Sequence, residues 1–262
     1  MPADRDGTMA LLSVSTGCFR THDYDAIAQW LTMTSADAIE VIIYNDFAER
    51  MECVRERFQG VGRRISAVHS PKQIQTFLST PGEEWRGEEL LRTTVELARD
   101  LGSSMVVVHP WDGRYASLDL DAIGTTLARC AEHAGEHGIT LSLEALPSRH
   151  ARPSRILEYL LSFSDTFTYT LDFEYAKIYG MFDELLAFSP RLSNVHLRDF
   201  DGRWLIGGRR AYVRPFLGEV DFEARIGEIR ATGYDGPYVL EAPYPTIGEL
   251  ENALAQFRQF IR

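Results

Sequence analysis

The sequence predicts a single α/β domain that folds as a (β/α)8 TIM barrel. Three observations support this prediction: eight short apolar runs, an amphipathic segment after each run, and a length of 262 residues, close to the roughly 250 that such a barrel needs. The runs are rich in Val, Ile and Leu and mostly continuous, as in parallel strands covered on both faces. An open doubly wound sheet is the alternative, disfavoured because no G-x-G-x-x-G follows the first run.

The expected strands and helices alternate along the whole chain. The strands are Leu11–Val14, Ala38–Ile43, Ile65–His69, Met105–His109, Ile139–Glu144, Tyr169–Asp172, Leu192–His196 and Tyr238–Glu241. The helices, bounded by caps, prolines or glycines, are Tyr24–Met33, Phe47–Phe58, Glu89–Leu101, Leu120–Ala134, Ser154–Phe163, Met181–Phe188, Phe222–Ala231 and Ile247–Ile261. Because this alternation has no break, we expect residues 11–262 to form one domain after a flexible tail of residues 1–10.

Composition and charge exclude several classes of function. The formal net charge of −11 argues against binding to nucleic acid or to anionic membranes. Three cysteines without CxxC spacing indicate reduced thiols rather than a disulfide framework. The N-terminal residues are polar and show no signal peptide, and no apolar run approaches the roughly 18 residues of a membrane helix. We therefore expect a cytoplasmic protein.

Four potential metal ligands stand at the ends of the last four strands. They are Glu144, Asp172, His196 and Glu241, on strands five to eight. Any one carboxylate there is often just the N-cap of the next helix, but four on adjacent strands form an arc at the C-terminal rim, where barrel enzymes place their sites. An oxygen-rich set with one nitrogen suits Mn²⁺, Mg²⁺ or Co²⁺ better than a closed structural zinc.

Two histidines end strands three and four at the same expected rim. His69 and His109 either ligate a second metal or donate hydrogen bonds to a substrate oxygen. Trp111 follows His109 closely, and it either forms an apolar wall for the face of a sugar ring or packs over the barrel. We take all three as candidate substrate-binding residues.

Arginines gather in two of the expected rim loops. They are Arg149 and Arg152 after the fifth strand, and Arg203, Arg209, Arg210 and Arg214 after the seventh. Either they clamp a carboxylate or phosphate of a substrate, or they form local ion pairs in a solvated loop, the more common fate of charge runs. Arg198, two residues after His196, is a further candidate substrate contact. Glu174 is either an additional rim acid or a solvated or capping residue.

Several segments resemble the superfamily of xylose isomerase-like barrels. They are VVVHPW, LSLEALP, YTLDFEYA, NVHLRD, PFLGEVDF and GYDGPYVLEAP. That superfamily includes sugar phosphate isomerases and epimerases, inosose dehydratases and DNA-repair enzymes of the endonuclease IV type (AP endonuclease family 2). The resemblance runs from about Leu11 to the last helix. Similarity to ketose 3-epimerases implies that Glu144, Asp172, His196 and Glu241 hold one divalent metal, Mn²⁺ first, with Mg²⁺, Co²⁺ or Zn²⁺ as alternatives.

The sequence departs from the endonuclease pattern at two places. The family often has a histidine three residues after the strand-six aspartate, where this chain has Tyr175. The Asp-x-His pair expected after strand seven is also missing. The resemblance therefore disfavours a trinuclear zinc site and cleavage at abasic sites.

The expected reaction is proton transfer next to a carbonyl, in a sugar or polyol isomerase or epimerase of carbohydrate metabolism. A metal stabilises the enediolate, and by the resemblance Glu144 and Glu241 serve as acid and base on opposite faces of the substrate. One carboxylate working on one face gives isomerisation, and loss of a β-hydroxyl gives a lyase acting on a keto-inositol or dehydroshikimate-like ring. A non-catalytic barrel subunit is the remaining alternative. The expected partners are a small carbohydrate or polyol and copies of the chain in a homodimer or homotetramer.

Overall fold

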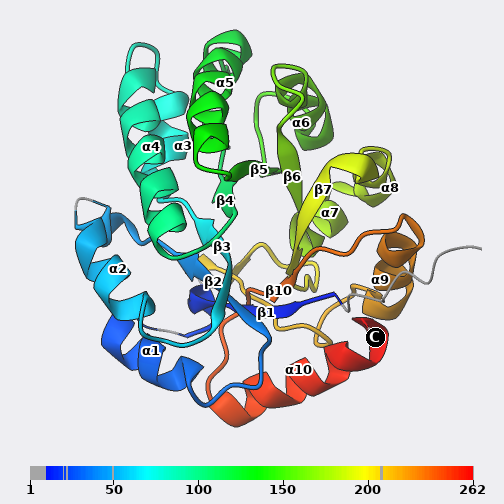
Figure 1. Ribbon diagram of the computed structural model, residues 1–262. Coiled ribbons are helices and arrows are strands. Elements are labelled where there is room, and N and C mark those ends of the chain that lie inside the picture. Colours follow the sequence, from blue (N-terminus) through cyan, green and yellow to red (C-terminus); the bar gives the residue numbers. More distant parts are fainter. Residues whose placement is uncertain (1–9, 20, 22, 49, 207–208, 262) are drawn as a thin grey trace, which may run out of the picture.

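The eight long strands form a closed parallel barrel surrounded by helices, as Figure 1 shows. The computed structural model describes residues 10–19, 21, 23–48, 50–206 and 209–261. Around the barrel the strands follow the order β1, β2, β3, β4, β5, β6, β7 and β10 and close by pairing of β10 with β1. The predicted TIM barrel is therefore confirmed. The predicted tail of residues 1–10 lies, apart from Ala10, outside the described residues.

The barrel strands begin and end within one residue of the predicted runs. They are β1 (Leu12–Ser15), β2 (Ala38–Ile42), β3 (Arg64–His69), β4 (Met105–Val108), β5 (Thr140–Glu144), β6 (Thr168–Asp172), β7 (Leu192–Leu197) and β10 (Tyr238–Leu240). Nearly all their residues are buried, because helices cover the outer face and side chains fill the interior. Continuous apolar runs located them for this reason.

The helices form the outer layer. They are α1 (Tyr24–Leu31), α2 (Met51–Phe58), α3 (Gln73–Leu78), α4 (Glu84–Asp100), α5 (Leu120–Glu136), α6 (Pro153–Leu161), α7 (Phe173–Tyr179), α8 (Phe182–Leu186), α9 (Phe222–Ala231) and α10 (Ile247–Ile261). Short 3-10 turns are η1 (Thr16–Cys18), η2 (Asn45–Phe47) and η3 (Ser189–Arg191). The side chain of Asp23 caps α1 by accepting from the backbone N–H groups of Asp25 and Ala26. In the described part of the chain, no helix is long and apolar enough to cross a membrane.

Several helix boundaries differ from the prediction. The predicted helix 24–33 ends at Leu31, and 47–58 is split, since η2 precedes α2. The predicted helix 89–101 begins five residues earlier, at Glu84. The sequence did not reveal this first turn because it has no apolar periodicity. The predicted helix 181–188 shortens to α8. Just before it, Gly180 adopts a left-handed conformation (φ 54°) that ends α7.

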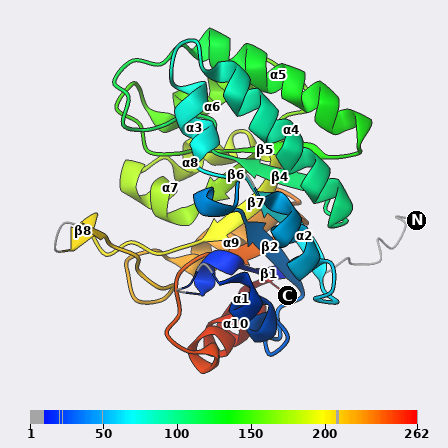
Figure 2. The same cartoon turned by 90° about the vertical axis from the view of Figure 1, so that its left-hand side faces the viewer.

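Three elements were not predicted from the sequence. Helices α3 and α7 are each too short for a helical pattern of apolar residues to be recognised in the sequence. The hairpin formed by β8 (Leu205–Ile206) and β9 (Arg209–Arg210) has two residues in each strand. This hairpin projects from the loop that follows β7, as Figure 2 shows. It therefore extends from the C-terminal rim, where the predicted ligands lie.

Candidate metal centre

The four predicted ligands converge at the C-terminal rim. Glu144 and Asp172 are the last residues of β5 and β6, His196 is the penultimate residue of β7, and Glu241 directly follows β10. In the strand register Asp172 lies beside His196. One ligand atom from each residue lies within 4.8 Å of the others. The structure thus brings together the whole arc that the sequence predicts.

The imidazole of His196 lies at the centre of this group. Its Nδ1 is 3.1 Å from Glu241 Oε2, 3.5 Å from Glu144 Oε1 and 3.9 Å from Asp172 Oδ2. Both His196 Nδ1 and Glu241 Oε2 are buried without a hydrogen-bond partner. A nitrogen lone pair that faces three carboxylates, with buried atoms left unsatisfied, is the donor arrangement that suits a divalent cation.

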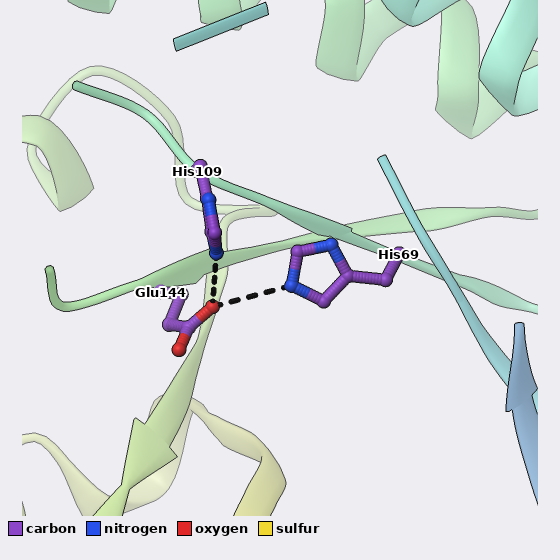
Figure 3. Close-up of side chains that lie close together, drawn as sticks. All are labelled: His69, His109 and Glu144. Carbon is purple, nitrogen blue, oxygen red and sulfur yellow. Dashed lines mark hydrogen bonds and ion pairs between the residues drawn. The ribbon is translucent and has the colours of Figure 1, made fainter. Parts of the chain in front are cut away.

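Glu144 also belongs to a second group, which it forms with His69 and His109. Figure 3 shows these three side chains. His69 Nε2 and His109 Nε2 both point at Glu144 Oε2, at 3.3 Å and 2.7 Å. The two rings meet edge to face with centroids 4.6 Å apart. Both histidines are buried, and both contact the Glu144 carboxylate. Their predicted roles, as substrate contacts or as ligands of a second ion, remain predictions.

The two carboxylate oxygens of Asp172 face different ways. Oδ1 accepts from the backbone N–H of Tyr175 at 2.9 Å and thereby caps α7. Oδ2 faces the other ligands and accepts from Arg198 Nε at 2.7 Å. The capping role and the ligand role are therefore compatible in one residue.

Arg198 places a fixed positive charge inside the ligand group. Besides Asp172, its guanidinium lies 3.6 Å from Glu241, 3.8 Å from Glu144 and 3.5 Å from Glu174. Its side chain is only 9% exposed. Arg198 was predicted to contact the substrate. In the structure its guanidinium contacts the carboxylates of the predicted metal ligands.

Glu174 links this centre to the hairpin. Its carboxylate is buried and lies 2.6 Å from Arg210 Nη2 of β9. Arg210 in turn packs over the ring of Trp204, with 3.7 Å between its guanidinium carbon and the ring centroid. The expectation that Glu174 is a solvated residue is therefore wrong. It is a buried acid because α7 begins directly after β6 and carries residue 174 inward.

Tyr175 fills the position where the resemblance expects a histidine. Its ring packs under Arg198, at 4.6 Å from the guanidinium carbon. Burial raises the pKa of the Tyr175 hydroxyl above the ordinary range. At position 175 the chain therefore presents an aromatic support for Arg198.

Burial and neighbouring charges shift the pKa values of the ligands in different directions. Burial raises the pKa of Glu144, but His109 and His196 lower it. Burial also raises the pKa of Glu241, but His196 and Arg198 lower it. Both pKa values therefore lie below the usual range. Burial raises the pKa of Asp172 to about 7 against the opposing charge of Arg198. Burial lowers the pKa of His196, but the charges of Glu40, Glu241 and Glu144 hold it well above its ordinary value. The site thus favours positive charge at its centre.

Burial lowers the pKa of His109 to about 4, although Glu144 opposes the change. His69 has a raised pKa, because its contact with Glu144 and the charge of Glu40 outweigh burial. The two histidines against the same carboxylate oxygen therefore have pKa values shifted in opposite directions.

Carboxylates outnumber cationic side chains at this rim. The largely buried acids are Glu40, Glu144, Asp172, Glu174 and Glu241, against the guanidinium groups of Arg198 and Arg210. Isolated buried charges are costly unless they are paired or bind a metal. The number of buried carboxylate oxygens at this place is a second reason that the residues fit a divalent cation.

Trp111 has a different environment from the one predicted for a sugar-binding wall. It is fully buried, and its indole Nε1 donates to the carbonyl oxygen of Pro147 at 3.1 Å. Its ring has no face open to a substrate in this conformation. The structure therefore favours the alternative, in which Trp111 packs over the barrel.

Four of the six predicted rim arginines form local ion pairs. The pairs are Arg152 with Glu184, Arg203 with Asp201, Arg210 with Glu174, and Arg214 with Glu249. These contacts bear out the alternative of ion pairing over that of a free anion clamp. The side chain of Arg209 lies outside what the structure describes.

Glu40 is the buried acid that sequence reasoning missed. It lies in the middle of β2, is fully buried, and reaches across the barrel interior to His196. A signal was present, since Glu40 is the one charge within the otherwise apolar run AIEVII. A charge inside a strand covered on both faces needs a partner in the barrel interior.

Comparison with known proteins agrees with the architecture. Residues 20–262 match the sequence profile of the family described as xylose isomerase-like TIM barrel. The chain belongs to this family. The expected superfamily is therefore confirmed over nearly the whole length.

Individual relatives of this xylose isomerase-like barrel are distant. An uncharacterized protein of Methanocaldococcus jannaschii is 27% identical over 168 residues, which are 58% of this chain and 55% of that protein. The match thus spans about half the length of this curated relative. D-allulose 3-epimerase from Methylomonas sp. superposes with a TM-score of 0.72 and 18% identity, covering 95% of this chain and 90% of the epimerase.

A probable 3-DHS dehydratase from Bacillus anthracis superposes with a TM-score of 0.71 and 16% identity, covering 95% of this chain and 98% of the dehydratase. At these identities the likeness shows the common fold. An epimerase and a dehydratase are equally similar to this barrel. The reaction must therefore be argued from the site.

Proposed function

We propose that this barrel is a divalent-metal-dependent isomerase or epimerase of small carbohydrates or polyols. The observation that carries the proposal is the convergence of Glu144, Asp172, His196 and Glu241 within 4.8 Å at the C-terminal rim. Unsatisfied buried atoms and an excess of carboxylates support a bound cation at this place. Mn²⁺ is the first candidate, because the donors are three carboxylates and one imidazole.

These four residues would hold the ion, which would act as a Lewis acid on a carbonyl and its neighbouring hydroxyl oxygen. Glu144 and Glu241 lie 3.5 Å and 3.1 Å from His196 Nδ1, and their lowered pKa values favour the ionised form. An ionised carboxylate is able to remove a proton from the carbon next to a carbonyl. A second carboxylate on the other side then returns a proton to the opposite face, which inverts that carbon.

Arg198 keeps these carboxylates ionised. Its guanidinium lies 3.8 Å from Glu144 and 3.6 Å from Glu241, and it neutralises part of their mutual repulsion. A proton removed from the substrate rests on a carboxylate, where deuterium from the solvent replaces part of it before a proton is returned. Return from the same carboxylate to one face gives isomerisation, and use of both carboxylates gives epimerisation.

A dehydratase is the second candidate, favoured by the histidine pair. A leaving β-hydroxyl needs a proton donor, and His69 has a raised pKa beside Glu144. In this version the site removes the same proton and His69 protonates the departing hydroxyl. The product is then an unsaturated ketone, one water lighter than the substrate.

The proposal is tested by solvent exchange. The protein is loaded with Mn²⁺ and incubated in D₂O with a panel of ketoses, aldoses and cyclic polyol ketones. We expect deuterium to enter one substrate at the carbon next to its carbonyl, and mass spectrometry separates this outcome from loss of water. Glu144→Gln and Glu241→Gln are each expected to abolish exchange while circular dichroism stays unchanged. Glu158→Gln, at an exposed helical position, is the matched control.

Either of two results would overturn the proposal. One is turnover of a substrate at wild-type rate by both variants, because the bases would then lie elsewhere. The other is cleavage of an abasic DNA duplex without exchange in any carbonyl compound, because that activity belongs to phosphodiester chemistry.

A further inference from the structure

We infer that Glu40 is a positioning residue, which orients His196 so that its Nδ1 faces the metal position. The inference rests on the proposed function only in taking that position to hold a divalent ion. It adds a residue from β2, on a part of the barrel that contributes no ligand. The hydrogen bonds that the structure gives for the Glu40 carboxylate are with Asn194 and His196, so Glu40 acts through His196.

The contact is made inside the barrel, on the side of the imidazole away from the ligands. Glu40 Oε2 lies 3.1 Å from His196 Nε2, while Nδ1 on the other side of the ring faces three carboxylates. Both residues are fully buried. β2 and β7 are not neighbours in the barrel, so this contact crosses the interior.

Asn194 holds the Glu40 carboxylate in place. It precedes His196 by two residues on β7, so its side chain points to the same face of the strand. Its Nδ2 donates to Glu40 Oε2 at 3.0 Å. The same nitrogen lies 3.1 Å from His196 Nε2. Because an ionised carboxylate oxygen only accepts, the contact between Glu40 and His196 is a hydrogen bond when Nε2 carries its proton, and Asn194 then donates to Glu40 and not to Nε2.

These hydrogen bonds determine which tautomer a neutral His196 imidazole adopts. A proton on Nε2 leaves the lone pair of a neutral imidazole on Nδ1, and a metal binds that lone pair. A carboxylate that accepts from the far nitrogen fixes the ring orientation and makes the ligand more basic. Glu40 Oε1 has no hydrogen-bond partner, so the carboxylate gains nothing further from its burial. Only the contacts through Oε2 explain why a charge is kept in this apolar strand.

A purely structural role makes a different prediction. If Glu40 served only to fill the interior, an apolar residue of similar volume would replace it without effect on metal affinity, and often with a gain in stability. A positioning role predicts a loss of metal affinity even where the fold becomes more stable. Metal affinity and stability therefore separate the two roles.

The experiment uses Glu40→Leu, which removes the acceptor, and Glu40→Gln, which keeps one carbonyl oxygen. Ser66→Ala is the matched control, because Ser66 also lies in the barrel, bonds to Ser13 at 2.8 Å and touches no ligand. The first readout is the ring Nε2–H of His196 in metal-free protein, observed by ¹H–¹⁵N correlation with labelled histidine and assigned with His196→Gln. The second is the dissociation constant for Mn²⁺, measured by titration.

We expect a slowly exchanging Nε2–H resonance in the wild type and in Glu40→Gln, and its loss in Glu40→Leu. We expect the dissociation constant for Mn²⁺ to rise about 10- to 100-fold in Glu40→Leu, less in Glu40→Gln, and to stay unchanged in Ser66→Ala. An Nε2–H resonance that persists in Glu40→Leu overturns the inference, as does an unchanged dissociation constant in that variant. Failure of the wild type to bind Mn²⁺ refutes the proposed function, and the resonance then decides the orienting role by itself.

Discussion

Arg198→Met tests whether the rim is held together by electrostatic compensation. Methionine keeps most of the length and volume of arginine but removes its charge. In the structure Arg198 donates to Asp172 at 2.7 Å and lies within 3.8 Å of Glu144, Glu174 and Glu241. Without metal, its loss leaves these buried carboxylates with less positive charge near them.

The magnitude follows from the burial of the group. A hydrogen bond to a charged partner contributes about 1.5–3 kcal/mol, and removal of one member of a buried ion pair costs about 3–5 kcal/mol because the other charge is left uncompensated. We therefore expect Arg198→Met to lower the free energy of unfolding by about 3–5 kcal/mol in metal-free protein. Mn²⁺ supplies positive charge to the same carboxylates, so the loss is expected to be smaller when the ion is present.

The assay is urea unfolding in EDTA and in Mn²⁺, with a check that the slope of the transition is unchanged. Arg155→Met is the matched control, since Arg155 pairs with Glu158 at 2.7 Å but is 73% exposed, and exposed pairs contribute about 0–1 kcal/mol. A loss below about 1 kcal/mol for Arg198→Met in EDTA would refute the compensation argument.

Two further predictions concern the loops that carry the rim. The first is Asp112→Asn. Burial raises the pKa of Asp112, but hydrogen bonds from Arg114 and Thr76 lower it below the ordinary value. Its contribution is therefore present above the unfolded pKa of about 3.9 and disappears as pH falls through the folded pKa. Asp112→Asn should lower the free energy of unfolding at neutral pH by about 1–2 kcal/mol, with no difference in acid. An equal difference at both pH values contradicts this. The second is Gly113→Ala, whose Cβ would lie 2.2 Å from the carbonyl oxygen of Pro147. It should lower stability by about 1–3 kcal/mol. In contrast, the Cβ of Gly135→Ala in α5 meets nothing within 4 Å, and this variant should raise stability by about 0.4–1 kcal/mol. Calorimetry checks both variants. A Gly113→Ala variant as stable as the wild type would contradict the close contact with Pro147.

The sequence predicted the barrel and its four ligands because both follow from local pattern. Continuous apolar runs indicate buried parallel strands, and a charge at the end of such a run indicates the rim, as for Glu144 and Asp172. Both signals are contained within a few consecutive residues. The closure of the barrel then brings the ends together without further information from the sequence.

The residues that were missed depend on contacts between distant segments. Glu40 appeared to be part of an apolar strand, and only closure of the barrel places it against His196 of β7. Glu174 appeared to follow a strand into solvent, but α7 begins at once and Arg210 of the hairpin covers it. The hairpin itself has two residues in each strand, too few for any periodicity to reveal.

The central claim is that Glu144, Asp172, His196 and Glu241 bind one divalent ion. The most direct measurement is a crystal structure of protein grown with Mn²⁺, with anomalous data collected at the manganese edge. We predict one anomalous peak at coordination distance from His196 Nδ1 and from the three carboxylates. No peak at this position, or a peak held only by His69, His109 and Glu144, would contradict the claim.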